Sequence, residues 1–248
     1  MSIRKNIWNT KDNVEAYDRY ARNYPMYQNT SNDLVVFADI RPGSTIVDLA
    51  AGTGATSEAI LFHINNEGQI FAVDQAAEMI NKAKENLAEY KNINFIVAAA
   101  EDLSSSITAP ADVVLCNSAF WQMNPRPTLK SVANILKEEG VFAFNMPDQY
   151  FIHSDFHKKT KSAAAYNTES LINWAREAGL ELEKEEIKEY SKSIEEVAAF
   201  NQIPIMAANF KTPGEIEQLI KILREREARG ERKNSQWAYF LFRKMKKD

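Results

Sequence analysis

The stretch that decides the fold reads STIVDLAAGTG over residues 44–54. Its first six residues are rich in β-branched and apolar side chains, which predicts a short buried strand. The turn signal RPG at 41–43 precedes this strand, and a loop with two glycines follows it. From Ala55 onward, apolar residues recur near helical spacing. The stretch therefore predicts a unit of strand, glycine loop and helix.

The same alternation of strand and helix continues toward residue 145. The expected strands cover 44–49, 69–74, 94–98, 112–116 and 141–145, and the expected helices cover 55–64, 76–90 and 129–137. Short, continuous apolar strands that alternate with helices indicate a parallel sheet with both faces covered. The sequence therefore predicts an α/β fold.

The remainder of the chain departs from this alternation. A helix is expected over 169–178, followed by strands over 182–190 and 236–243, with a helical stretch from 194 to 229 between those strands. No internal repeat or linker interrupts the sequence. We therefore expect a single domain, 1–248, with an N-terminal helical extension over 1–40. A helical insert over about 191–232 is expected to form a cap over the substrate.

Composition narrows the class of protein. The 248 residues carry a net charge of −4, which argues against a dedicated nucleic-acid binder with a basic face. One cysteine, Cys116, cannot form an internal disulfide, and no Cys/His cluster has zinc-finger spacing. No apolar run is long enough to span a bilayer, and the N-terminus is not a signal peptide. These features predict a cytoplasmic protein without a membrane partner.

Two aspartates flank the glycine loop in the predicted fold. Asp74 ends the second strand, 20 residues after Gly54, where a carboxylate can accept both hydroxyls of a ribose. Asp48 lies inside the first strand, just ahead of the loop. A carboxylate there suits a cationic cofactor better than a pyrophosphate, which it would repel. The alternative interpretations are that Asp48 is a buried acid tied to backbone donors and that Asp74 is a helix N-cap.

At this point the sequence resembles the class I S-adenosylmethionine-dependent methyltransferases. IVDLAAGTG at 46–54 is similar to their first motif, with Ala50 where the family usually has glycine. VDQAAEMI at 73–80, AAEDL at 99–103 and the strand 112–117 resemble the second, third and fourth motifs. YDxxAxxY at 17–24 resembles the helix that precedes the first motif in the ubiquinone- and menaquinone-biosynthesis-type branch.

The resemblance implies a Rossmann-like, doubly wound sheet of seven strands, mostly parallel with an antiparallel last strand. It implies S-adenosylmethionine as the cofactor, with Asp74 on the ribose, Met79 against the adenine and Asn117 beside the methyl group. The family commonly has Asp where Ala99 stands, so Glu101 or Asp102 is the candidate for that adenine contact. The residues expected to contact the cofactor are Asp48, Ala50, Gly52, Gly54, Asp74, Gln75, Met79, Ala100, Glu101, Asn117 and Tyr24.

Tyr24 enters this set through its spacing. Tyr17, Tyr20, Tyr24 and Tyr27 would share one face of a single helix. Such a stripe is commonly packing, although a tyrosine face also attracts a sulfonium through a cation–π interaction.

The implied reaction moves a methyl group to a small, partly apolar or aromatic metabolite, with an oxygen, nitrogen or carbon acceptor left open. Candidate pocket residues are Phe120, Trp121, Met123, Tyr150, Phe151, Trp174 and Phe200. His153 is the candidate general base, ahead of His157, while His63 is read as structural, and no metal site is expected. Two alternatives remain: an NAD(P)-dependent oxidoreductase, and a non-catalytic protein that binds S-adenosylmethionine.

Overall fold

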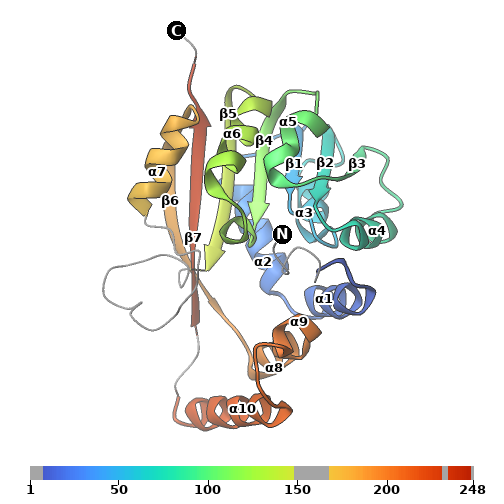
Figure 1. The fold of residues 1–248 in the computed structure, drawn as a ribbon, viewed down its shortest axis with the longest axis vertical. Helices are drawn as coiled ribbons and strands as arrows, with labels where there is room; N and C mark the ends of the chain where they lie inside the picture. The colour runs from blue at the N-terminus through green and yellow to red at the C-terminus, as the bar shows by residue number, and fades with distance from the viewer. Residues whose placement is uncertain (1–7, 148–167, 231–233, 247–248) are drawn as a thin grey trace.

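A computed structural model of the chain describes residues 8–147, 168–230 and 234–246. Figure 1 shows a central sheet with helices on both faces. The strands are β1 (Thr45–Leu49), β2 (Gln69–Asp74), β3 (Ile93–Val97), β4 (Ala111–Asn117), β5 (Leu136–Pro147), β6 (Leu180–Ser191) and β7 (Asn234–Lys244). Their order is β3-β2-β1-β4-β5-β7-β6. β7 runs antiparallel to both of its neighbours, and the other pairings are parallel. The predicted seven-stranded fold with an antiparallel last strand is confirmed.

Alternate residues of each strand face opposite layers, because side chains on a strand point up and down in turn. On one face, Ile46 and Leu115 belong to a core that includes α2 (Met26–Phe37) and α3 (Ala55–His63). On the other face, Val47 and Cys116 join a core that includes α5 (Leu103–Ser106), α6 (Pro125–Ile135) and α7 (Thr168–Glu177). The apolar strands in the sequence are thus buried on both sides, as a parallel sheet requires.

The sheet reverses its direction of growth at β1. From β1 the chain adds β2 and β3 on one side, and then crosses to add β4 and β5 on the other. Ligands of such folds bind outside the carboxyl ends of the strands at this switch point. The glycine loop and Asn117 both lie at these ends, after β1 and at the end of β4.

The N-terminal extension forms two helices instead of one. α1 covers Lys11–Asn23 and α2 begins at Met26, with Tyr24 in an extended conformation between them. The expected single helix through the four tyrosines is therefore wrong. Pro25 explains the break, because a proline disfavours helical backbone at the residue before it.

The insert between β6 and β7 is also divided. It contains α8 (Ile194–Gln202), α9 (Pro204–Ala207) and α10 (Pro213–Ala228). Ser193 accepts a hydrogen bond from the Glu196 amide, and the Glu196 carboxylate receives one from the Ser193 backbone, so a capping box starts α8. Proline again begins each following helix, at α9 and α10.

The extension and the insert contact each other, although they lie far apart in sequence. The Tyr20 hydroxyl donates to Glu196 Oε1 at 3.2 Å, and the Ile205 amide donates to Asn13 Oδ1 at 2.9 Å. Figure 1 shows α1 beside α8 and α9 at the same end of the sheet. Within the described part of the chain, no helix is long and apolar enough to cross a membrane.

Candidate functional site

The loop after β1 is shaped by left-handed backbone conformations. Gly52 and Gly54 have φ of 55° and 99°, and Ala50 has φ of 61° although it carries a side chain. A Cβ on Gly54 would lie 2.9 Å from Leu87 Cδ1, so a side chain at this position would collide with the segment after α4 (Ala77–Asn86). The left-handed φ of Gly54 therefore favours glycine, and Leu87 Cδ1 would have to shift to admit a side chain.

Asp74 closes the loop from the end of β2. Its Oδ2 accepts from the Gly52 amide at 3.0 Å, and its Oδ1 accepts from the Ala76 amide at 2.9 Å. Burial raises the pKa of Asp74, and the hydrogen bonds from Ala76 and Gly52 oppose that rise. The Gln75 backbone provides a third hydrogen bond, and a carboxylate offers about four acceptor sites, so some capacity remains. Asp74 thus holds the loop and starts the segment before α4, while keeping capacity to accept further hydrogen bonds.

Asp48 is a buried carboxylate with one oxygen satisfied. Its side chain is 1% exposed, and its Oδ2 accepts from Ser57 Oγ at 2.6 Å. Its Oδ1 is buried and has no hydrogen-bond partner. Burial raises the pKa of Asp48 to about 7, and the hydrogen bond from Ser57 partly offsets this rise, which the negative charge of Asp74 increases further. An unpaired carboxylate oxygen in this position costs free energy unless a donor or a cation faces it.

Asn117 presents a second unsatisfied acceptor at the same end of the sheet. Its Nδ2 donates to Ser31 Oγ at 2.9 Å, whereas its Oδ1 is buried without a partner. Ser31 in turn shares a 2.9 Å hydrogen bond with Thr56 Oγ1. Thr56 and Ser57 are consecutive in the first turn of α3. Ser57 binds the other oxygen of Asp48, and Thr56 binds Ser31, which in turn binds the amide nitrogen of Asn117. The first turn of α3 therefore positions both side chains.

The tyrosine that lies against the glycine loop is Tyr17. A Cβ built on Gly52 would lie 3.7 Å from Tyr17 Cε1. Tyr24 instead stacks on Tyr20, with ring centroids 5.3 Å apart. A role for Tyr24 at the cofactor stays a prediction, and Tyr17 joins the candidate residues on its position.

The remaining candidates surround the same loop. Met79 is buried with Val14 and Ala76, and the rings of Trp8 and Tyr17 pack against this small cluster. Gln75 is exposed, Glu101 is half-buried and Ala100 is buried at the turn after β3. These positions line the ends of β2 and β3, next to the loop.

Sequence reasoning missed several residues of this site. Ser31, Thr56, Ser57 and Tyr17 are placed there by tertiary contacts. Two signals were present in the sequence: the hydroxyl residues Thr56 and Ser57 shortly after the glycine loop, and the stripe of tyrosines to which Tyr17 belongs. Ser31 carried none, because it belongs to a helix that precedes the first strand.

Some candidates lie elsewhere or outside the described residues. His153, His157, Tyr150 and Phe151 fall in 148–167, which is outside that part of the chain. Phe120 is fully buried against Phe144, with centroids 4.3 Å apart, and so belongs to the core. Phe200 packs on Tyr20 at 5.3 Å. Across residues 8–147, 168–230 and 234–246, no group of three or more His, Cys, Asp or Glu residues could hold a metal ion.

Residues 40–203 match a family model described as a methyltransferase domain. The chain belongs to this methyltransferase family. Together with the strand order, the match confirms the class I S-adenosylmethionine-dependent methyltransferases and S-adenosylmethionine as the cofactor. It also favours this family over the NAD(P)-dependent oxidoreductases. The quinone-biosynthesis branch stays a prediction.

Individual relatives differ in chemistry. The chain is 26% identical over 162 residues to carboxy-S-adenosyl-L-methionine synthase of Vibrio cholerae, covering 60% of this chain and 66% of the relative. It is 30% identical over 114 residues to tRNA 5-carboxymethoxyuridine methyltransferase of Escherichia coli, covering 44% of this chain and 42% of that protein. The chain thus spans less than two thirds of the length of these relatives.

A solved structure with the same fold is phosphoethanolamine N-methyltransferase 2 of Haemonchus contortus in complex with S-adenosyl-L-methionine. The TM-score is 0.64 at 16% identity, covering 99% of this chain and 60% of that one. At this identity the likeness shows the fold alone.

Proposed function

We propose that this protein transfers the methyl group of S-adenosylmethionine to a small, partly apolar or aromatic metabolite. The observation that carries the proposal is the pair of buried, unpartnered oxygens, Asp48 Oδ1 and Asn117 Oδ1, beside the glycine loop. A carboxylate and an amide oxygen that face the same site suit an ammonium group, which donates hydrogen bonds and carries positive charge.

Seven of the candidate residues have a defined task in this proposal. Asp74 accepts from the ribose hydroxyls, Met79 packs against the adenine, and Glu101 takes a polar contact with the base. Gly52 and Gly54 leave room for the backbone to approach the cofactor. Asp48 and Asn117 receive the ammonium group. These acceptor oxygens and the open loop thus fit S-adenosylmethionine in its positive charge and its hydrogen-bonding groups.

When bound, the cofactor supplies a methyl group that its sulfonium has already activated. The residues of the chain then orient the acceptor and exclude water, and orientation of two bound reactants contributes up to about 7–11 kcal/mol. A proton acceptor is needed only where the nucleophile arrives protonated. We keep His153 as the proposed base for that case.

The proposed acceptor is small because of the surroundings of the site. The extension and the insert pack on each other through Tyr20 and Glu196, which narrows the approach for a macromolecule. The net charge of −4 also disfavours nucleic acid. Because one relative is named as a tRNA methyltransferase, tRNA is the macromolecule to test beside small metabolites as a methyl acceptor.

Cofactor binding is tested by calorimetry with S-adenosylmethionine and, separately, with NADH. Asp74→Ala should weaken S-adenosylmethionine by about 1.5–3 kcal/mol for each charged hydrogen bond lost. Asp39→Ala, which removes an exposed carboxylate away from the loop, is the control. Unchanged affinity in a folded Asp74→Ala variant would contradict the role of Asp74.

Turnover is tested by mass spectrometry of a metabolite panel and of tRNA, looking for the gain of one methyl group. Methylation of a metabolite supports the proposal, and methylation of tRNA alone overturns the acceptor class. Tight cofactor binding without any product favours the non-catalytic alternative. His153→Ala and His157→Ala, assayed from pH 6 to 8, test the base. Full turnover in both variants would exclude these histidines.

A further inference from the structure

Asn145 is a buried amide near the carboxyl end of β5. It is 0% exposed, within a run of otherwise apolar residues from 141 to 146. Across the sheet, it is the register partner of Asn117 on β4 and of Tyr239 on β7. Burial of an amide costs free energy unless hydrogen bonds satisfy it, so the partners of Asn145 indicate what it holds in place.

The amide oxygen of Asn145 holds the turn that follows β4. Asn145 Oδ1 accepts from the Ser118 amide at 2.8 Å. Asn145 Nδ2 donates to the Thr30 carbonyl oxygen of α2 at 3.4 Å, and the side chain also forms a hydrogen bond with the Tyr239 hydroxyl. This one side chain therefore connects the end of β4 with α2 and β7.

Ser118 adopts a backbone conformation that needs such support. Its φ is 58°, in the left-handed region that costs free energy for a residue with a side chain. Two residues later, Phe120 is anchored in the core, so relaxation of Ser118 would rotate the peptide group that precedes it. That peptide group begins with Asn117. The hydrogen bond to Asn145 opposes the rotation, because it fixes the direction of the Ser118 N–H.

The same hydrogen bond fixes the direction of the Asn117 carbonyl. In a trans peptide, the N–H and the C=O point in opposite directions. β4 lies between β1 and β5, and the Ser118 N–H points to Asn145 on β5. The Asn117 carbonyl therefore points away from β5, toward the side of β1 and the glycine loop. The pairing of β1 with β4 ends at Asp48 and Leu115, two residues before Asn117.

We propose that Asn145 is a positioning residue, which holds the end of β4 so that Asn117 receives the ammonium group of S-adenosylmethionine. This role rests on the proposed function, in which Asn117 faces that group. Asn145 is completely buried, and both ends of its amide are engaged within the protein. It therefore acts through Ser118 and Asn117 instead of by contact with the cofactor. Removal of Asn145 should weaken the binding of the amino-acid end of the cofactor.

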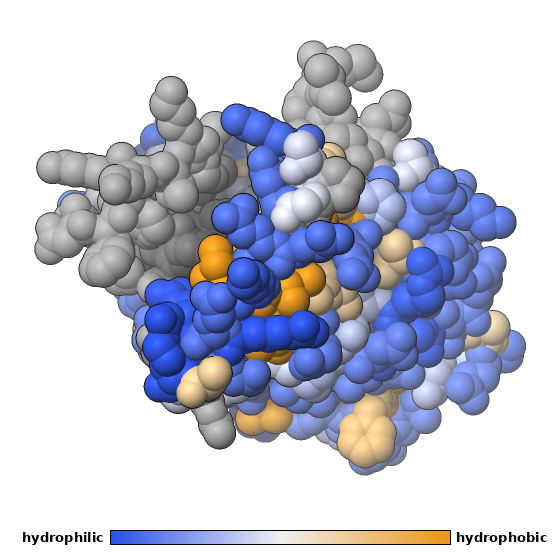
Figure 2. All heavy atoms as spheres, turned by 90° about the horizontal axis from the view of Figure 1, so that it is seen from below, coloured by the Kyte–Doolittle hydropathy of each residue, from blue (hydrophilic) through white to orange (hydrophobic). Residues whose placement is uncertain are grey.

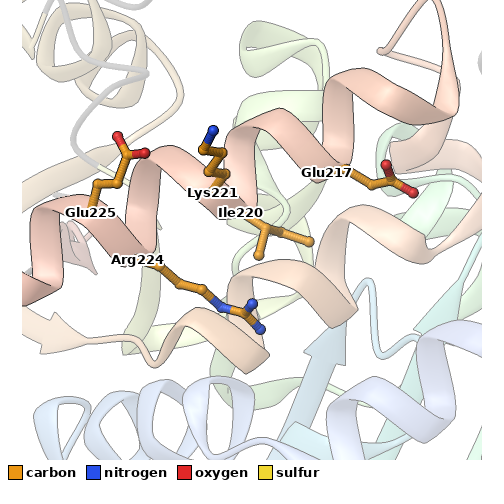
Figure 3. Close-up of a pocket in the computed structure, with 5 residues that line it drawn as sticks. All are labelled: Glu217, Ile220, Lys221, Arg224 and Glu225. Atoms are coloured by element: carbon orange, nitrogen blue, oxygen red, sulfur yellow. The ribbon is translucent and has the colours of Figure 1, made fainter.

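An open pocket on α10 provides a control for the place of binding. Helix α10 lies at the lower end of the molecule in Figure 1, and Figure 2 looks onto that end, where most of the surface is hydrophilic. Figure 3 shows the residues that line the pocket, which are Glu217, Ile220, Lys221, Arg224 and Glu225. Two acids and two bases cancel in charge, so the pocket offers a cation no net attraction. Arg224→Ala should therefore leave cofactor binding unchanged.

The experiment compares two ligands in calorimetric titrations of the full chain. S-adenosylmethionine carries the ammonium group, whereas methylthioadenosine keeps the adenine and the ribose but lacks the amino-acid end. Asn145→Leu should weaken S-adenosylmethionine about tenfold, as expected for roughly one hydrogen bond, and should leave methylthioadenosine unchanged. Asn145→Ala, which removes the amide without adding bulk, should give the same pattern. Circular dichroism confirms that each variant is folded.

Asp112→Ala is the matched control. Asp112 Oδ2 accepts from the Thr45 amide at 2.8 Å, so a side-chain oxygen again holds a backbone amide, but at the opposite end of β4. Its removal should leave both affinities unchanged. Asp74→Ala should instead weaken both ligands, because both carry the ribose.

The strain at Ser118 allows a second test of the mechanism. Glycine adopts the left-handed conformation without a steric cost, so Ser118→Gly makes the turn less dependent on Asn145. In a Ser118→Gly protein, Asn145→Leu should weaken S-adenosylmethionine by less than about threefold, because the two positions are coupled. The same tenfold loss in both backgrounds would contradict the role of Asn145 in holding the turn.

Failure of this role and failure of the proposed function give different results. If Asp74→Ala weakens both ligands but the Asn145 variants bind S-adenosylmethionine as the wild type does, the cofactor site stands and the positioning role is wrong. Equal weakening of both ligands by the Asn145 variants would also overturn the role, since it indicates general damage to the site. If Asp74→Ala changes neither affinity and Arg224→Ala lowers them, the cofactor binds elsewhere and both proposals fall.

Discussion

At the scale of single residues, the candidate site contains a buried polar atom without a hydrogen bond and a residue with a strained backbone conformation. Asp48 is a buried acid with an unpaired oxygen, and Ala50 adopts a left-handed conformation that glycine would adopt more easily. Both stand in the first motif, next to the switch point of the sheet. Strain and unsatisfied polar groups concentrate at functional sites, where a ligand completes them.

Asp48 should give the cofactor-free protein a distinctive dependence of stability on pH. Its folded pKa of about 7 exceeds the ordinary value of 3.8, so the folded state holds this proton more tightly. The contribution of Asp48 to the free energy of unfolding is thus present below about pH 4 and is lost as pH rises through 7. Urea unfolding of Asp48→Asn should show a flatter profile between pH 4 and 7 and greater stability at pH 8.

Asp39→Asn, at an exposed carboxylate, serves as the control and should reproduce the wild-type profile. Asp48→Asn should also bind S-adenosylmethionine more weakly, because the cation loses its charged partner. Identical pH profiles for wild type and Asp48→Asn would exclude the proposed ionisation.

The loop backbone predicts opposite outcomes for two small substitutions. Ala50→Gly relieves a left-handed conformation that costs about 1–2 kcal/mol, against about 0.4–1 kcal/mol of added freedom in the unfolded chain. It should be neutral or stabilise the protein by up to about 1.6 kcal/mol. Gly54→Ala meets both a φ of 99° and Leu87 Cδ1, and should cost about 1–3 kcal/mol. Urea unfolding measures both, and a Gly54→Ala protein as stable as the wild type would contradict the loop geometry.

At the scale of elements, a polar network ties α2 to the last two strands. Tyr190 donates to Asp33 and shares a 2.5 Å hydrogen bond with Tyr239. Lys188 Nζ lies 3.0 Å from Asp33 Oδ1. Through this network, β6 and β7 hold the helix whose Ser31 reaches Asn117. The position of Asn117 therefore depends in part on contacts with β6 and β7, the two strands at one end of the sheet.

Tyr190→Phe should test how far this network supports the fold. The substitution removes two hydrogen bonds, one of them to a carboxylate, and should lower the free energy of unfolding by about 2–3 kcal/mol. Lys188→Met removes partly exposed ion pairs with Asp33 and Glu186 and a cation–π contact with Tyr239, and should cost about 1 kcal/mol. Thermal unfolding compares the two. Equal effects would show that the phenol network contributes little.

At the scale of the whole molecule, the N-terminal extension contacts the insert between β6 and β7. α1 is tied to α4 by Lys82 with Glu15 at 3.0 Å and by Asn86 with Asp18 at 2.8 Å. The same helix contacts α8 through Tyr20 and Glu196. The extension thus connects the segment beside the cofactor with the insert proposed as a cap.

This arrangement predicts that the extension and the insert respond together to the cofactor. Lids belong to the less stable parts of a fold and gain protection on closure. Hydrogen exchange with and without S-adenosylhomocysteine should show slower exchange in both α1 and α8 when the product is bound. Amides of β7 provide an internal reference. Equal protection of both helices in the two states would contradict closure.

The sequence by itself was enough to predict the strands, the helices that alternate with them and the cofactor. The apolar strands, the glycine loop, Asp48 and Asp74 follow from local patterns and spacing, whereas the antiparallel last strand was implied by the resemblance to a known family. These features are encoded by residues that lie close together in the chain, so pattern and structure agree. The helix break at Tyr24 was missed although Pro25 signals it, because the regular spacing of the tyrosines suggested one continuous face.

Only the tertiary structure decided which residues complete the site. Ser31, Thr56 and Tyr17 come together because α1 and α2 pack across the carboxyl ends of β1 and β4. Contacts of this kind join segments that are distant in sequence, and no local pattern records which buried oxygen lacks a partner.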